Sequence, residues 1–175
     1  MAKVIMIIPP ERFRDEELFH TRAELEKAGY AIVIASTQKG TCPGSRGGHA
    51  EAEMTLDEVS IREYDAVVFV GGGGSKLLIN NPLAHMIARD MYQNGKVVAA
   101  ICLAPVILAN AGLLKNKNAT VAGTEARTIE NSGAIYMGPG VTVDGNIVTA
   151  NAPKASRLFG KTIVEILGTQ LSSTQ

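Results

Sequence analysis

The chain has no tryptophan, and it has few of the residues that bind metals or form disulfides. Its 175 residues include two cysteines, Cys42 and Cys102, and three histidines. Two cysteines in unrelated contexts do not make the multiple-disulfide framework of a small secreted domain, and they have no zinc-ligand spacing. We therefore expect two free thiols in a reducing compartment, with no metal and no other cofactor.

An excess of one charge and a long apolar run are also missing. Lys plus Arg and Asp plus Glu both count 17, so the net charge is zero, which argues against nucleic acid or an anionic membrane as a partner. The apolar runs have strand length, well below the roughly 20 residues of a membrane span. Residues 1–8 have no small-residue cleavage site and indicate a first strand instead of a signal peptide. We expect a cytoplasmic protein with no membrane association.

Apolar runs alternate with helical patterns over a length that suits a single domain, residues 1–175. Four runs have the composition of buried strands: Lys3–Ile8, Ala31–Ala35, Asp65–Val70 and Val97–Ile101. Four stretches have helical character: Asp15–Ala28, Pro82–Asn94, Ala104–Ala111 and Lys154–Leu167. Gly29, Gly95 and Gly112 end the first three.

Continuous apolar strands separated by helices are typical of a parallel sheet covered on both faces. The prediction is an α/β fold: a flavodoxin-like three-layer sandwich with a mostly parallel sheet. Thr37–Met54 is rich in Gly, Ser and Pro and predicts a hairpin or an irregular loop. Val141–Ala150 alternates β-branched residues around Asp144-Gly145, which predicts a β-hairpin near the C-terminus.

Cys102 is the clearest candidate for chemistry. It follows the strand Val97–Ile101 directly and precedes Pro105 and a short helical stretch. A nucleophile at such a strand-to-helix turn resembles the nucleophile elbow of hydrolases, although the Gly-x-Ser-x-Gly pattern is absent. The helix N-terminus would lower the pKa of the thiol. The alternative is that Cys102 is one more small apolar residue in a buried strand.

Two other predicted strands end near Cys102, because the carboxyl ends of parallel strands share one edge of the sheet. One leads into Arg14 and Glu17, and the other into Gly71-Gly72-Gly73-Gly74. The glycine run lacks the Gly-Lys-Ser/Thr of a phosphate loop, since Ser75 comes before Lys76. An oxyanion hole is the favoured alternative, because a glycine backbone N–H approaches a negative oxygen without a side chain in the way.

Together these motifs resemble the ThiJ/PfpI superfamily, which includes the parkinsonism-associated protein deglycase and archaeal intracellular proteases. The similarity extends over nearly the whole chain. It rests on motifs in a fixed order: Phe13-x-Asp15-x-Glu17-Leu18, Ala28-Gly29, Ala35-Ser36, Thr55-x-Asp57-Glu58-Val59, Asp65-Ala66 before Gly71-Gly72, Ala100-Ile101-Cys102-x-x-Pro105, Ala111-Gly112-Leu113-Leu114-Lys115 and Val143-Asp144-Gly145-Asn146.

The resemblance implies a role for four of these positions. Cys102 would be the reactive cysteine, and Glu17 a buried acid within hydrogen-bond reach of its sulfur. The N–H groups of Gly72 and Leu103 would be the oxyanion donors. A protonated carboxyl can donate to a thiolate or to a sulfinate formed by oxidation. The alternative for Glu17 is a solvated residue in an acidic first helical turn.

The chain departs from the family pattern where a histidine is expected. Leu103 follows the cysteine where proteolytic members have histidine, and no histidine occurs near Thr120–Thr124, where deglycase-like members have one. Arg14 replaces a second acid of the proteases. Thr124, Glu125 and Asn151 are candidates for the vacant place. We expect structural or solvated roles for His20, His49 and His85, and for Cys42 a loop thiol; a resolving or interface cysteine is the alternative.

Three functions follow from the resemblance. The first is a cysteine-dependent enzyme acting on small carbonyl compounds, with glyoxalase or deglycase chemistry in stress defence. The second is a non-catalytic redox or chaperone-like stress protein, and the third is a PfpI-type cysteine peptidase, which Leu103 disfavours. The resemblance also implies a homodimer or a higher homo-oligomer.

Overall fold

The computed structural model describes residues 2–173. Its main sheet has seven strands in the order β10-β11-β7-β6-β1-β2-β5. The central strands are β1 (Lys3–Ile7), β2 (Ala31–Ser36), β6 (Ala66–Phe69) and β7 (Val97–Ile101), which are parallel to their neighbours. Residues of β6 and β7 are buried throughout, as expected for strands covered on both faces. The predicted α/β sandwich is confirmed.

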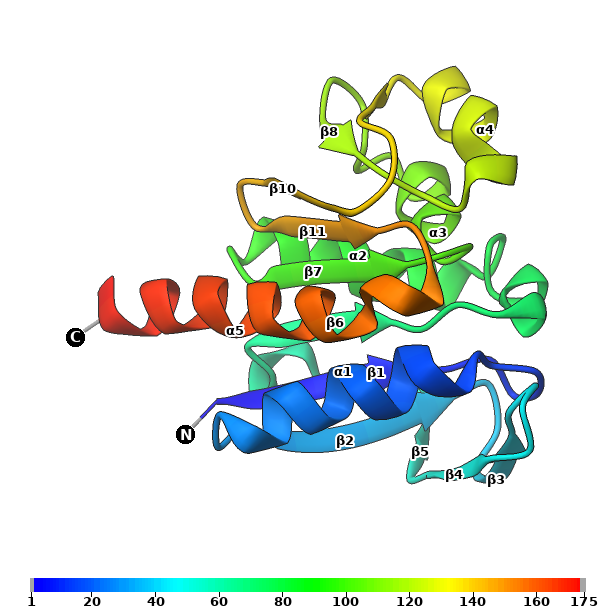
Figure 1. Cartoon of the computed structure of the whole chain (residues 1–175). Helices are drawn as coiled ribbons and strands as arrows, with labels where there is room; N and C mark the ends of the chain where they lie inside the picture. Colours follow the sequence, from blue (N-terminus) through cyan, green and yellow to red (C-terminus); the bar gives the residue numbers. More distant parts are fainter. Residues whose placement is uncertain (1, 174–175) are drawn as a thin grey trace.

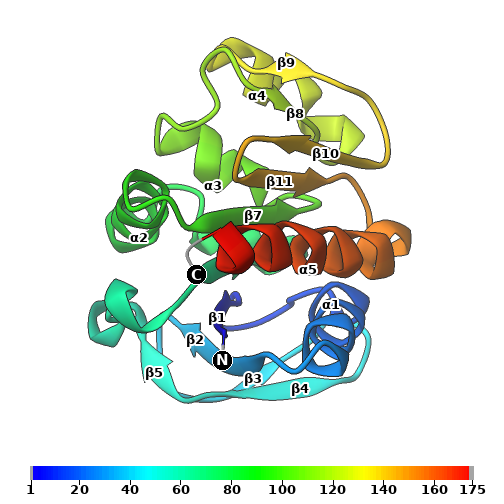
Figure 2. The same ribbon diagram turned by 90° about the vertical axis from the view of Figure 1, so that its left-hand side faces the viewer.

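Helices cover both faces of the sheet (Figures 1 and 2). On one side α1 (Asp15–Lys27) packs along α5 (Ser156–Ser173), and on the other lie α2 (Pro82–Gln93) and α3 (Pro105–Asn110). Alternate strand residues feed two separate cores: Ile5 and Ile7 face the α2–α3 layer, whereas Val4 and Met6 face the α1–α5 layer. Strand alternation therefore decides which layer each side chain joins.

The two predicted hairpin regions both form. Thr37–Met54 contains the antiparallel pair β3 (Gly40–Pro43) and β4 (His49–Ala52), followed by β5 (Met54–Thr55). At the far edge, β10 (Val141–Asp144) pairs antiparallel with β11 (Ile147–Ala150). Asp144 faces Ile147, so the two-residue connection is Gly145-Asn146, one position later than predicted.

Other predicted boundaries differ from those of the structure, most of all for the last helix, which ends at Ser173 instead of Leu167. The last helix begins at Ser156 instead of Lys154, because a 3₁₀ turn over Pro153–Ala155 precedes it, and it continues past Leu167. Three short elements are not predicted from the sequence: α4 (Ala126–Asn131), β8 (Asn118–Ala119) and β9 (Ile135–Tyr136). These elements are too short to show a period in the sequence.

The parallel strands bring four chain segments together at their carboxyl ends. These segments follow β1, β6, β7 and β11, and they contain Arg14, Glu17, Gly72, Cys102, Leu103 and Asn151. Thr124 and Glu125 enter from a 3₁₀ turn over Gly123–Glu125. None of the helices within residues 2–173 is long and apolar enough to cross a membrane.

Candidate active site

Cys102 takes a left-handed backbone conformation directly after β7, with φ of 64°. Two hydrogen bonds hold it there. Its N–H donates to the carbonyl oxygen of Ala150 (2.9 Å), and its own carbonyl oxygen accepts from the N–H of Ala122 (2.7 Å). A non-glycine residue in this region costs about 1 kcal/mol or more, and such strain concentrates at functional sites. The strand end therefore fixes the thiol in one direction.

Glu17 comes from the first turn of α1 and is completely buried. Its Oε1 accepts a hydrogen bond from the N–H of Gly71 (2.9 Å), whereas Oε2 has no partner among residues 2–173. A β-carbon on Gly71 would lie 2.6 Å from Oε1 and 3.0 Å from the Cys102 β-carbon, so the carboxyl, the glycine and the cysteine are packed against one another. The first turn of α1 is thus not the solvated acidic surface of the alternative interpretation.

Glu17 and Cys102 shift each other's titration. Burial raises the pKa of Glu17 to about 8, so the carboxyl is largely protonated at neutral pH. Burial, and next the charge of Glu17, raise the pKa of Cys102 to about 12. The charge of Glu17 raises the pKa of Cys102 only when the Glu17 carboxyl is ionised. A protonated Glu17 removes that contribution and supplies an O–H that can donate to the sulfur.

The sequence-based expectation of a lowered thiol pKa is therefore wrong for this arrangement. The helix behind Cys102 has six residues, Pro105–Asn110, so its dipole is small. The Leu103 N–H and the Arg14 guanidinium do lower the pKa of the thiol, but burial outweighs them. A raised pKa makes the second ionisable group, Glu17, more important for generating a thiolate.

The two predicted oxyanion donors differ in their surroundings. The N–H of Leu103 lies near the Cys102 sulfur and lowers the pKa of the thiol. Gly72 has φ of 112°, and a β-carbon there would lie 2.5 Å from the Arg12 carbonyl oxygen and from the Arg14 nitrogen. Only glycine fits this position. The Gly72 N–H has no acceptor in the described part of the chain, so it is available to an incoming oxygen.

Two cavities lie at this edge of the sheet. The larger has about 550 Å³ and is lined by Arg14, Glu16, His20, Ala152, Pro153, Lys154 and Arg157. The second has about 430 Å³ and is lined by Ser75, Lys76, Ile79, Leu103, Val106, Thr124 and Glu125. Cys102 packs with the α1–α5 core, the side of the larger cavity, and its neighbour Leu103 lines the other. Arg14 of the larger cavity and Leu103 of the second are the lining residues that affect the pKa of the Cys102 thiol.

The structure separates the three candidates for the vacant histidine position. Thr124 and Glu125 line the second cavity together with Leu103, which places them beside the candidate site. Asn151 lines neither of the two cavities. Its side-chain oxygen accepts from the N–H of Gly140 (2.9 Å) and its N–H donates to the Gly140 carbonyl oxygen (3.1 Å). Asn151 therefore holds the start of β10.

His20 lines one of these two cavities, whereas His49 and His85 line neither. His85 contacts the carbonyl oxygen of Ile79 through Nε2 (2.7 Å), and His49 lies exposed in β4. His20, which the sequence suggested to be a surface or packing residue, lines the larger cavity. No group of three or more His, Cys, Asp and Glu side chains within residues 2–173 is arranged to hold a metal ion.

The sequence did not assign a role at the site to Ser75, Lys154 or Arg157. Gly71 was expected to offer an oxyanion N–H together with Gly72, but its N–H donates to Glu17 instead, a contact that depends on the fold. Ser75 is fully buried and its hydroxyl has no partner in residues 2–173. Lys154 and Arg157 reach the site edge only because α5 packs beside α1.

Comparison with known proteins finds relatives over nearly the whole chain. The family model described as DJ-1/PfpI matches residues 2–166. The chain is 45% identical over 169 residues to an uncharacterised protein of Methanocaldococcus jannaschii, covering 95% of this chain and 82% of that protein. It is 34% identical to a protein of Pyrococcus furiosus named deglycase PfpI, covering 93% and 98% of the two chains.

A solved structure has the same fold over almost its whole length. The ThiJ/PfpI domain protein from Brachyspira murdochii superposes with a TM-score of 0.94 at 35% identity, covering 95% of this chain and 96% of that one. With a family model over nearly the entire chain, relatives above 30% identity and a shared fold, the chain belongs to the DJ-1/PfpI family.

Proposed function

We propose that this protein is a cysteine-dependent enzyme that converts small reactive carbonyl compounds in stress defence, with glyoxalase- or deglycase-like chemistry. The observation that carries the proposal is the buried Glu17 carboxyl against Cys102, with one oxygen bonded to Gly71 and the other unpartnered in the described chain. A carboxyl with a pKa of about 8 exchanges protons near neutral pH, as general acid–base catalysis requires.

On a dicarbonyl such as methylglyoxal, the proposed reaction needs only water as a second reactant. The Cys102 sulfur adds to the aldehyde carbon, so a carbon–sulfur bond forms as the carbonyl π bond breaks, and the oxygen takes the thiol proton. The ionised carboxylate of Glu17 then removes the proton from that carbon and delivers it to the neighbouring carbon, while the new hydroxyl proton moves to the neighbouring carbonyl oxygen. This transfer gives a thioester. Water hydrolyses the thioester to a hydroxy acid and regenerates the thiol, without an external oxidant.

The N–H groups of Gly72 and Leu103 support this scheme as donors to the oxygen that becomes negative. Histidine is not required, because the acid–base group lies directly beside the sulfur. Relatives named deglycase PfpI and protein/nucleic acid deglycase 2, the latter from Escherichia coli, are consistent with carbonyl chemistry.

Turnover of methylglyoxal by purified variants tests the proposal. We expect Cys102→Ala to reduce the rate to background and Glu17→Gln to reduce kcat about 100-fold, because one acid–base group is lost. Cys42→Ala is the matched control and should retain the wild-type rate. Wild-type turnover equal to that of Cys102→Ala would refute the proposal.

A second candidate is a redox sensor in which Cys102 is oxidised to a sulfinate without turnover. The partial exposure of Cys102, beside Arg14 and a protonated Glu17, favours it, whereas Cys42 is fully buried. After mild peroxide treatment, mass spectrometry should find two added oxygens on Cys102 before Cys42 reacts. Equal oxidation of both thiols would argue against this role. A peptidase remains disfavoured, because Leu103 replaces the histidine that proteolytic relatives carry.

A further inference from the structure

The larger cavity is lined by more basic than acidic side chains, whereas the chain as a whole has equal numbers of both. Its lining includes three cationic side chains, Arg14, Lys154 and Arg157, against one carboxylate, Glu16. The whole chain has 17 basic and 17 acidic residues and no net charge. An excess of positive charge in a cavity of about 550 Å³ therefore marks this place as different from the average surface.

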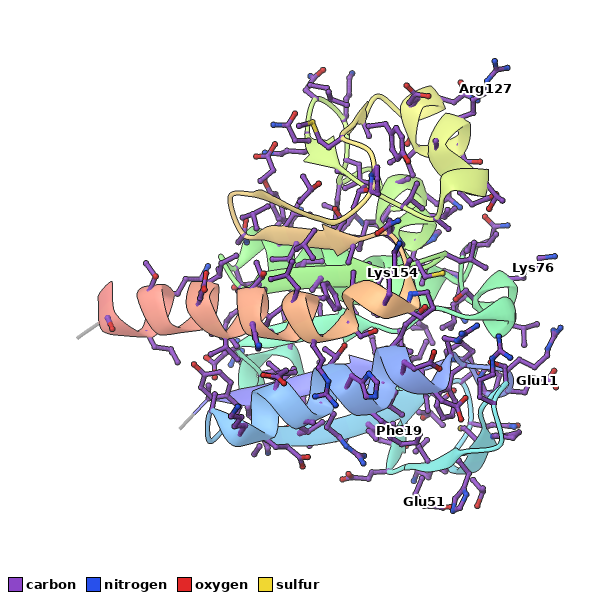
Figure 3. The ribbon with its side chains drawn as sticks, viewed as in Figure 1. Glu11, Phe19, Glu51, Lys76, Arg127 and Lys154 are labelled. Atoms are coloured by element: carbon purple, nitrogen blue, oxygen red, sulfur yellow. The ribbon has the colours of Figure 1, made fainter. Side chains whose placement is uncertain are left out.

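The cations are not all neutralised by partners. Arg14 pairs with Glu16 (Nη2 to Oε2, 3.0 Å), and Arg157 pairs with Glu24 (Nη1 to Oε2, 3.2 Å). Lys154 has no hydrogen-bond or ion-pair partner in the described part of the chain. It lies beside the first turn of α5, whereas Lys76 of the other cavity projects beyond the ribbon (Figure 3). The N-terminal end of this long helix adds positive potential next to Lys154.

The cavity is connected to the thiol by short structural links. Cys102 packs with the α1–α5 core, the side on which the cavity opens. Arg14 interacts electrostatically with both Glu17 and Cys102, and its N–H donates to the Gly71 carbonyl oxygen (3.0 Å). Ala152 follows Ala150, whose carbonyl oxygen holds the Cys102 N–H. Arg14 therefore belongs both to the lining of the cavity and to the charged surroundings of the thiol.

From these contacts we infer that the larger cavity is a subsite for an anionic group, a phosphate or a carboxylate, carried by the carbonyl substrate. The inference rests on the proposed function for the reactive carbon alone, since anion binding does not require turnover. It narrows the substrate class from neutral dicarbonyls to carbonyl compounds with an anionic end. Lys154 is the free donor, and Arg14 and Arg157 supply further donors from either side.

Binding of inorganic phosphate tests the subsite without any catalytic readout. The chain has three histidines, and His20 alone among them lines this cavity. Phosphate is titrated into the protein and followed by NMR, with chloride of equal ionic strength as the control. The His20 ring resonances should shift and saturate, while the resonances of His49 and His85 should keep their positions. Acetate in place of phosphate separates carboxylate from phosphate recognition.

Three substitutions in and just before α5 provide the contrast. Lys154→Gln should raise the dissociation constant of phosphate about fivefold, and adding Arg157→Gln should raise it further. Lys161→Gln removes the same charge from α5 at a position outside the cavity lining and should leave the constant unchanged. Unsaturable shifts, or equal loss in Lys154→Gln and Lys161→Gln, would show general charge screening and overturn the subsite.

Substrate comparison separates this inference from the proposed function. Glyceraldehyde 3-phosphate should protect Cys102 from alkylation at lower concentration than glyceraldehyde, and Lys154→Gln should remove the difference. Phosphate binding without carbonyl turnover would leave the subsite standing and refute the enzyme. Methylglyoxal turnover without specific phosphate binding would refute the subsite and leave the enzyme standing.

Discussion

The two cysteines of this protein lie in different structural surroundings. Cys42 lies in β3 opposite Ala50, fully buried, and its thiol donates to the Gly40 carbonyl oxygen (3.7 Å). Cys102 is half-buried at a strand end with φ of 64° and faces Glu17. Burial raises the pKa of both thiols. Burial therefore does not distinguish them; the strained backbone, the acid neighbour and the adjoining cavities do.

The hairpin around Cys42 has a stabilising role beside the site. The buried Asp15 carboxylate accepts hydrogen bonds from the N–H groups of Arg46 (2.9 Å) and Gly48 (2.7 Å). These bonds tie the loop between β3 and β4 to the first turn of α1, two residues before Glu17. One thiol thus belongs to a supporting element and the other to the candidate site.

The largest effect should come from the acid beside Cys102. Burial raises the pKa of Glu17 from 4.5 to about 8, so between these values the folded protein holds a proton that the unfolded chain releases. This contribution to stability is complete below about pH 4.5 and is lost as pH rises through about 8, by up to about 1.4 kcal/mol per pH unit. Glu17→Gln should flatten that decline, measured by urea unfolding from about pH 5 to about pH 8.

Glu16→Gln is the matched control for this experiment. The hydrogen bond with Arg14 lowers the pKa of Glu16, so its stabilising effect is present above the unfolded pKa of 4.5 and is lost only as pH falls further. Its removal should leave the slope between about pH 5 and about pH 8 as in the wild type. An unchanged slope in Glu17→Gln would show that Glu17 is ionised in the folded protein.

The next effect concerns the glycine that separates Glu17 from Cys102. A β-carbon on Gly71 would lie 2.5 Å from the Ile101 carbonyl oxygen and 2.6 Å from Glu17 Oε1. Gly71→Ala should cost about 3 kcal/mol of unfolding free energy. Gly73→Ala would meet nothing closer than 3.8 Å and should change stability by less than about 0.5 kcal/mol. Equal unfolding midpoints in urea would contradict this packing.

The smallest effect compares the backbone at the two cysteines. At position 102 the left-handed conformation favours glycine, so Cys102→Gly should be about 1 kcal/mol more stable than Cys102→Ala. At position 42, in a strand, Cys42→Ala should be more stable than Cys42→Gly by about the same amount. The opposite sign of the two differences, measured by urea unfolding, is the diagnostic. The same sign at both positions would show that the backbone at Cys102 is not strained.

Most of the fold could be predicted because its signals are local. The run Val97–Ile101 is a strand with the predicted bounds, and Pro82–Gln93 ends one residue before the predicted limit. Apolar runs and glycine stops act over a few residues, within reach of a sequence pattern. The pair β8–β9 joins residues 118 and 135 through two short segments, which no local pattern reveals.

The candidate site divides in the same way. By itself, the sequence determined the strand end that positions Cys102 and, through the family resemblance, pointed to Glu17, because both lie in contiguous motifs. Only the tertiary structure decided the raised pKa of the thiol, the Gly71–Glu17 contact, the separate role of Asn151, and the meeting of Lys154 with Arg14. These properties depend on burial and on contacts between segments that are separated along the chain, and chain order alone does not contain them.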